Sequence, residues 1–166
     1  MSSRLLIADD NATVRRLLRV LLETHDGWEV CGEAENGLEA VVKAKELKPD
    51  AVILDLAMPV MDGLRATREI SEALPGTPVL IHTLHNAPGM DLEVKKAGAR
   101  EIINKTDSAD KLVKAIEEGL AARREFTPPL SAEPSPEVTV ANNSAGNGSS
   151  ETPSASDDPN SGAKPN

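Results

Sequence analysis

The chain has 166 residues, of which 39% are hydrophobic and 27% charged, and its net charge is −9. This length suits one folded domain with a segment left over, and the apolar content is sufficient for a core. The acidic excess argues against a constitutive nucleic-acid binder, because phosphate recognition needs a basic surface. We therefore expect no direct nucleic-acid binding by this chain.

The single cysteine, Cys31, cannot form a disulfide framework within the chain, which is typical of a reducing compartment. The first eight residues hold only a short apolar run, which is too brief for a signal peptide. No stretch of the sequence is long enough to span a membrane. The sequence therefore predicts a soluble, cytoplasmic protein with no membrane partner.

Five short apolar runs are candidates for strands. Their residues do not alternate strictly between apolar and polar, which suits strands that are buried on both faces of a parallel sheet. In chain order they are residues 5–8, 30–31, 51–54, 79–81 and 102–103.

Segments with helical periodicity follow these runs. The apolar stripe of the first includes Leu17, and that of the second includes Leu38 and Val42. The third and fourth have weaker periodicity; Pro88 suits the first turn of the fourth helix, and Ser108 suits the N-cap of the fifth. In chain order the expected helices cover residues 12–24, 37–47, 63–74, 87–97 and 108–124.

Strands and helices thus alternate along the chain as five βα units. Right-handed crossovers between parallel strands then place helices on both faces of one sheet. The sequence predicts an α/β, doubly wound, flavodoxin-like fold with five parallel strands in the order 2-1-3-4-5.

The composition changes abruptly after Arg124. Residues 126–166 contain 7 of the 12 prolines, together with 8 serines and 5 asparagines. Such a segment cannot bury enough apolar surface to offset the entropy lost on ordering. We therefore expect a folded domain over residues 1–125 and a disordered, acidic tail over residues 126–166.

Polar side chains stand where the expected strands end, which is where open α/β sheets bind ligands. Asp9 and Asp10 follow the first run and Asp55 follows the third. Thr83 closes the fourth strand and Lys105 follows the fifth. Because the first and third strands are neighbours in the expected order, three carboxylates converge in one crevice, with the threonine and the lysine on its far side.

Three crowded carboxylates repel one another, and a divalent cation offsets that repulsion. Hard oxygen ligands favour Mg²⁺, with Mn²⁺ as the other option. A metal-bound carboxylate that faces an ammonium and a hydroxyl is equipped to receive a phosphoryl group itself. Asp55 is then the phosphoacceptor; Lys105 and the metal neutralise the phosphoryl oxygens, and Thr83 donates a hydrogen bond to one of them.

Five short motifs occur in a fixed order along the chain. They are Asp9-Asp10, Asp55-x-x-Met58-Pro59-x-Met61-Asp62-Gly63, Thr83, Ala97-Gly98-Ala99 and Lys105-Thr106. Each motif alone is weak, but five in this order are specific, and together they resemble a bacterial response-regulator receiver domain. The resemblance covers residues 4 to about 124 and is closest to CheY-like receivers of the LuxR/NarL-type regulators.

The resemblance implies that a sensor histidine kinase or a phosphotransfer protein donates a phosphoryl group to Asp55. It also implies that Asp10 binds Mg²⁺ directly, that Asp9 acts mainly through a water, and that the Ala57 carbonyl is a further ligand. The expected outcome is a switch that acts on a downstream protein target. Such a switch dephosphorylates itself and turns over no external substrate, so the chain is not expected to be an enzyme.

The chain departs from the family pattern at one switch position and in its domain content. In the family the residue three before Lys105 is an aromatic ring that follows the Thr83 hydroxyl inward, and here it is Ile102. We expect no DNA-binding output domain in residues 126–166, because they are too polar and proline-rich to fold as a helix-turn-helix. His85, two residues past Thr83, is placed to tune access of water at the rim of the pocket. The sequence leaves a monomer and a homodimer both open.

Three other functions compete with this prediction. A degenerate receiver that binds partners without phosphorylation stays open because of Ile102. A phosphate-ester hydrolase with an aspartate nucleophile typically needs an acid at the position of Ala57, and a flavin carrier would need a phosphate loop in place of the two leading aspartates. His82 and His85 invite a zinc site, but two histidines with no cysteine nearby are more often solvated or core residues.

Overall fold

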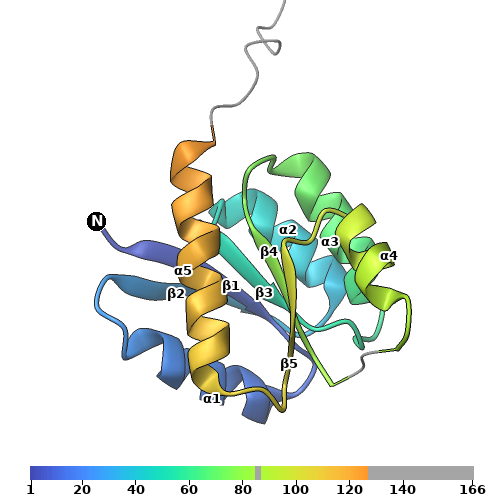
Figure 1. Cartoon of the computed structure of the whole chain (residues 1–166), viewed down its shortest axis with the longest axis horizontal. Helices are drawn as coiled ribbons and strands as arrows, with labels where there is room; N and C mark the ends of the chain where they lie inside the picture. Colours follow the sequence, from blue (N-terminus) through green and yellow to red (C-terminus); the bar gives the residue numbers. More distant parts are fainter. Residues whose placement is uncertain (85–86, 127–166) are drawn as a thin grey trace, which may run out of the picture. The chain divides into compact units, whose positions relative to one another are not determined.

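The computed structural model describes residues 1–84 and 87–126. In this part of the chain, strands and helices alternate and form one parallel sheet in the order β2-β1-β3-β4-β5 (Figure 1). The predicted fold class and strand order are therefore confirmed. The elements are β1 (Ser3–Ala8), α1 (Ala12–Glu23), β2 (Trp28–Ala34), α2 (Gly37–Leu47), β3 (Ala51–Leu54), α3 (Gly63–Ala73), β4 (Val79–Thr83), α4 (Met90–Lys96), β5 (Glu101–Asn104) and α5 (Ala109–Glu125).

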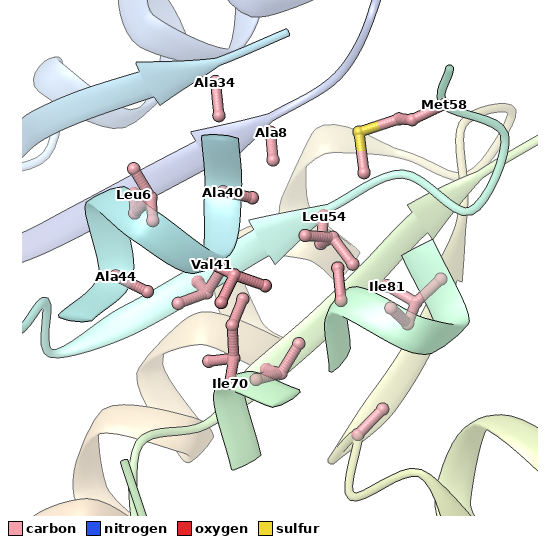
Figure 2. Packing of buried hydrophobic residues seen from close by; sticks show 14 of the residues in the cluster. Leu6, Ala8, Ala34, Ala40, Val41, Ala44, Leu54, Met58, Ile70 and Ile81 are labelled. Atoms are coloured by element: carbon pink, nitrogen blue, oxygen red, sulfur yellow. The ribbon is translucent and has the colours of Figure 1, made fainter. Parts of the chain in front are cut away.

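Helices cover both faces of the sheet, and each face has its own apolar core. Helices α1 and α5 pack on one face and α2, α3 and α4 on the other (Figure 1). All four residues of β3 are buried, as the unbroken apolar run predicts for a central parallel strand. Figure 2 shows the core on the face of α2, α3 and α4, in which side chains from four strands meet those of α2 and α3. Its labelled residues include Ala8, Ala34, Leu54, Ile81, Val41 and Ile70.

The register between β1 and β3 brings the ends of these two strands together. Leu5 lies opposite Ala51 and Ala8 lies opposite Leu54, so both strands end at the same level. The amide of Asp55 then donates to the carbonyl of Ala8 at 2.8 Å. The residues that follow β1 and β3 therefore start from neighbouring points on one edge of the sheet.

One expected helix start differs from that in the structure, and another agrees with it. Helix α4 begins at Met90, because Gly89 has a φ of 87° and cannot belong to a right-handed helix. Pro88 therefore precedes the helix rather than occupying its first turn. Ser108 does stand at the N-cap of α5, but its side chain makes no capping hydrogen bond.

The apolar stripes of α1 and α2 include residues that the folded chain leaves exposed. Leu18 and Leu22 of α1 are buried, whereas Leu17 is 65% exposed. In α2, Val41 is buried, whereas its neighbours at positions 38 and 42 are about half exposed. Helical periodicity thus predicts the helices correctly but overstates the apolar surface that they bury.

None of the helices in residues 1–84 and 87–126 is both long and apolar enough to cross a membrane.

Charged side chains join α1 to the edge strand β2. Arg19 Nε lies 2.6 Å from Glu33 Oε1, and Arg15 Nε lies 3.2 Å from the other carboxylate oxygen of Glu33. Burial alone raises the pKa of Glu33, but the hydrogen bonds and positive charges of the two arginines outweigh it and lower the pKa from its ordinary value of 4.5. A carboxylate whose pKa is lowered by folding stabilises the fold above its unfolded pKa, and that stability is lost as pH falls through the folded-state pKa.

We expect Glu33→Gln to lower the free energy of unfolding at pH 7 by under about 1 kcal/mol, because the pairs are partly exposed. The variant should lose less stability than the unsubstituted chain on acidification from about pH 5 to pH 3, since the titrating group is gone. Urea unfolding at several pH values measures this. Glu117→Gln, at an exposed position on α5, is the control; equal acid sensitivity of the Glu33→Gln variant and the unsubstituted chain would contradict the assignment.

Phe126 packs at the end of the sheet opposite the carboxyl ends of the strands. Its amide donates to the carbonyl of Arg123 at 3.1 Å. A Cβ added to Gly76 would lie only 2.3 Å from the Phe126 ring, so the ring rests directly on this glycine. The ring is 42% exposed and thus partly withdrawn from water.

A chain that ends at Phe126 should therefore unfold at a temperature a few degrees above a chain that ends at Glu125. Burying about half of a phenylalanine side chain is worth on the order of 1 kcal/mol, which corresponds to several degrees in a domain of this size. Thermal melting of both truncated chains and of full-length Phe126→Ala measures the difference. Identical melting temperatures of the two truncated chains would show that the ring contributes nothing.

Candidate functional site

The loop after β1 places two aspartates at the carboxyl edge of the sheet. Asp9 is 1% exposed, and its Oδ1 accepts a hydrogen bond from the amide of Asn11 at 2.9 Å. Asn11 is the N-cap of α1, where its side chain accepts from the amides of Thr13 and Val14. This local hydrogen bonding turns the chain sharply between β1 and α1, and it leaves Asp10 exposed beside the buried Asp9.

Asp55 completes a cluster of three carboxylates. It follows β3 and is only 5% exposed. One carboxylate oxygen from each of Asp9, Asp10 and Asp55 lies within 4.8 Å of the others. Oxygen atoms at this spacing, supplied by one buried edge of a sheet and open on the side of Asp10, fit a hard divalent cation such as Mg²⁺ or Mn²⁺.

Lys105 supplies the positive charge of the site. Its Nζ donates a hydrogen bond to Asp55 Oδ2 at 2.8 Å. It also lies 2.6 Å from Asp9 Oδ2, where it forms an ion pair without hydrogen-bond geometry. The backbone amide of Lys105 donates to the carbonyl of Thr83 at 2.9 Å, which fixes the start of this side chain to the end of β4.

The surroundings of Lys105 act on its pKa in opposite directions. Burial lowers the pKa, because it disfavours the charged ammonium. The hydrogen bond to Asp55 and the negative charges of Asp55 and Asp9 outweigh burial, so the pKa is raised from its ordinary value of 10.5. Lys105 is therefore a permanent cation at neutral pH.

The loop after Asp55 is shaped by packing and helix capping. Met58 and Met61 are buried, which anchors the loop on the core. Asp62 is the N-cap of α3 and its side chain accepts from the amide of Arg65 at 2.9 Å. A Cβ on Gly63 would lie 2.0 Å from the carbonyl oxygen of Asp55, so only glycine allows α3 to start this close to the aspartate. These residues hold Asp55 in place and do not enter the carboxylate cluster.

The other residues singled out in the sequence lie around this cluster. Ala57 is exposed, and its amide is 3.4 Å from Asp55 Oδ1. Thr83 ends β4, is fully buried, and lies opposite Asn104 of β5. Ile102 lies opposite Ile81 and packs, half-buried, against the core on the side of α4.

His82 and the predicted rim residue His85 do not form a described site. His85 lies outside the described residues, and so does the zinc alternative that depends on it. His82 points to the face of α1 and α5, where it lines a cavity of about 240 Å³. Its buried Nδ1 has no hydrogen-bond partner among the described residues. Burial and the nearby charge of Lys105 lower the pKa of His82, so that it is neutral at pH 7.

The sequence prediction missed Arg15. This arginine of α1 is 7% exposed and its Nη1 donates to the carbonyl oxygen of Asp9 at 2.8 Å. A signal was present, because Arg15 stands three residues before Leu18 and seven before Leu22, on the stripe that the helix buries. A charged residue on that stripe is the exception that points to a buried polar contact.

We expect Lys105→Met to lower the free energy of unfolding by about 3 kcal/mol in metal-free buffer. The substitution keeps most of the side-chain volume but leaves two buried carboxylates without their counter-charge, and breaking a buried ion pair on one side is strongly destabilising. Urea unfolding measures the loss.

Lys111→Met is the matched control, because Lys111 forms an exposed pair with Asp107 at 2.7 Å, and exposed ion pairs contribute little to stability. Equal losses for the two lysine variants would mean that Lys105 does not compensate the buried carboxylates.

Comparisons with known proteins agree with this geometry. Residues 5–117 match the family model of the response regulator receiver domain. The chemotaxis protein CheY of Thermotoga maritima is 41% identical over 116 residues, which cover 70% of this chain and 96% of CheY. The transcriptional regulatory protein YdfI of Bacillus subtilis is 41% identical over 110 residues, which cover 66% of this chain and 51% of YdfI.

Solved structures give the same result. A LuxR family two-component response regulator from Aurantimonas sp. superposes with a TM-score of 0.70 at 35% identity, covering 74% of this chain and 88% of that protein. The receiver domain of the putative response regulator NarL from Mycobacterium tuberculosis has a TM-score of 0.68 at 29% identity, covering 72% of this chain and 97% of that domain. The chain therefore belongs to the response regulator receiver domain family of two-component signal transduction.

Proposed function

We propose that Asp55 accepts a phosphoryl group from a sensor histidine kinase or a phosphotransfer protein, and that the phosphorylated chain acts as an interaction switch on a downstream protein. The observation that carries this proposal is the contact of the buried Asp55 carboxylate with Lys105 at 2.8 Å inside a cluster of three carboxylates. A buried carboxylate with an ammonium beside it and no packing role is arranged for chemistry rather than for stability.

In the proposed reaction, one carboxylate oxygen of Asp55 forms a bond to phosphorus while the bond from phosphorus to the donor nitrogen breaks. Oδ2 is engaged by Lys105, whereas Oδ1 has only a long contact of 3.4 Å with the amide of Ala57. Oδ1 is thus the more available nucleophile. Lys105 remains a cation throughout and stabilises the charge on the transferred group.

Asp9, Asp10, Asp55 and the carbonyl of Ala57 are the proposed ligands of Mg²⁺, with Mn²⁺ as a substitute. When bound, this ion supplies neutralisation of the phosphoryl oxygens. Asp9 and Asp55 are the buried members of the set, whereas Asp10 and Ala57 are exposed, which agrees with a site that opens to solvent on one side.

Thr83 and Ile102 are the proposed elements of the switch. Thr83 is buried at the end of β4, which is next in the sheet to β3, the strand that Asp55 follows. In this proposal the Thr83 hydroxyl moves toward the phosphoryl group and donates a hydrogen bond to it. Ile102 then moves toward the space that Thr83 leaves, by less than an aromatic ring would. We further propose that the chain works in the cytoplasm and turns over no external substrate. Apart from Phe126, the tail expected from the sequence lies outside the described residues.

Intact-mass spectrometry with acetyl phosphate and Mg²⁺ tests the phosphoacceptor. We expect one added phosphoryl group in the unsubstituted chain and none in Asp55→Asn, because the amide is a poor nucleophile. Asp62→Asn, in the same loop, keeps its capping ability and should be labelled normally. Stoichiometric labelling of Asp55→Asn, with no relocation to a neighbouring hydroxyl, would refute the assignment.

Thermal melting with Mg²⁺ tests the metal ligands. At ten times its dissociation constant, a bound ion stabilises the fold by about 1.4 kcal/mol, which is a shift of a few degrees in melting temperature. Asp10→Ala should remove this shift, while Asp26→Ala, at an exposed turn, should keep it. A full shift in Asp10→Ala would place the ion elsewhere.

A further inference from the structure

Arg15 is a buried cation that the proposed phosphoryl chemistry does not use. Of the six polar or charged residues buried in residues 1–84 and 87–126, it is the one cation. Taking a guanidinium out of water is unfavourable unless its donors are satisfied. The contacts of the Arg15 side chain therefore indicate its role in the structure.

The three guanidinium nitrogens of Arg15 donate to three acceptors in two segments, the end of β1 and the end of β2. Nη1 donates to the carbonyl oxygen of Asp9 at 2.8 Å, at the end of β1. Nε donates to Glu33 Oε2 at 3.2 Å, in β2. Nη2 donates to Glu35 Oε1 at 2.8 Å, directly after β2. The planar fork of arginine can satisfy all three acceptors at once, which the single ammonium of lysine cannot.

The bond to Asp9 acts on the acidic loop itself. The carbonyl of Asp9 belongs to the peptide group that leads into Asp10, so fixing this oxygen fixes the plane from which the Asp10 side chain departs. The Asp9 side chain is oriented separately, through the amide of Asn11. We propose that Arg15 is a positioning residue for the divalent cation site, which holds the Asp9–Asp10 peptide so that the Asp10 carboxylate lies beside those of Asp9 and Asp55. This inference rests on the proposed function of the carboxylate cluster.

The charge of Arg15 is compensated where it would otherwise oppose the cation. A guanidinium this close to the carboxylates would repel Mg²⁺, but Glu33 and Glu35 pair with it on its other side. Arg19 shares Glu33, at 2.6 Å, and makes no contact with Asp9 that the structure records in the described residues. Arg15 thus holds the Asp9–Asp10 peptide in place while adding little net charge to the site. Arg19 belongs to the same ion-pair network but does not contact that peptide.

Isothermal titration calorimetry of the full unphosphorylated chain with MgCl₂ tests the proposal. Arg15→Gln should weaken Mg²⁺ binding by about tenfold, which is the usual effect of losing a group that orients metal ligands. Arg15→Lys should recover part of the affinity, because its ammonium can still donate to the Asp9 carbonyl. Urea unfolding without Mg²⁺ reports the stability of each variant separately.

Two variants separate positioning from mere stability. Arg19→Gln removes the pair between Arg19 and Glu33 but leaves the hydrogen bond from Arg15 to the Asp9 carbonyl. It should therefore lower the stability of the fold and keep the affinity for Mg²⁺. Arg16→Gln changes an exposed neighbour on the same helix and should change neither. If Arg15→Gln does not fold, a weaker Mg²⁺ affinity of Arg15→Lys than of Arg19→Gln supports the proposal, and equal affinities overturn it.

The outcomes also distinguish this inference from the proposed function. Unchanged Mg²⁺ affinity in Arg15→Gln, or an equal loss in Arg19→Gln, overturns the positioning role while leaving the carboxylate site intact. Both the metal site and the role of Arg15 are overturned if the unsubstituted chain does not bind Mg²⁺, or if its Mg²⁺ binding persists in Asp10→Ala. Weakened binding confined to the Arg15 variants, with normal binding in both arginine controls, establishes the role.

Discussion

The mutual repulsion of three carboxylates at one edge of a parallel sheet is the constraint that organises this domain. The register of β1 and β3 brings Asp9 and Asp55 to neighbouring strand ends, so the fold concentrates negative charge where burial makes it most unfavourable. Lys105 offsets that charge with contacts to both aspartates. It can do so because its backbone is tied to Thr83 across the β4–β5 pair, from which a four-carbon side chain reaches the crevice. A site that is costly without a cation is also a site prepared to receive one.

The motif residues divide into those placed for chemistry and those that hold them in place. Asn11 and Asp62 cap the helices that follow the two acidic loops. Gly63 lets α3 begin against the carbonyl of Asp55, and the buried Met58 and Met61 pin the loop to the core (Met58 is labelled in Figure 2). Most residues of the sequence motifs therefore have structural roles, and only a few side chains at the strand ends form the candidate site.

The edge of the sheet contributes to the site as well. Strand β2 makes no direct contribution to the carboxylate cluster, yet Glu33 and the following Glu35 anchor the arginine that bonds to the carbonyl of Asp9. The acidic loop is therefore held from two directions, by its own Asx hydrogen bonds and by a buried guanidinium. Ile102, the proposed switch position, stands on the other edge strand, β5, half-buried against the core next to α4.

The sequence by itself determined the order of strands and helices, the parallel sheet and the convergence of Asp9, Asp10, Asp55 and Lys105, because these follow from local periodicity and from the rule that parallel strands end at one edge. Only the tertiary structure decided which apolar residues are buried: Leu17 lies on a helical apolar stripe, but it is 65% exposed, where it lines the cavity of about 240 Å³ beside His82. It also decided that α4 starts after Gly89, whose positive φ depends on the loop it closes. The tertiary structure likewise decided that Arg15 is buried, since its three acceptors lie at the ends of β1 and β2, which only the folded chain brings together around it.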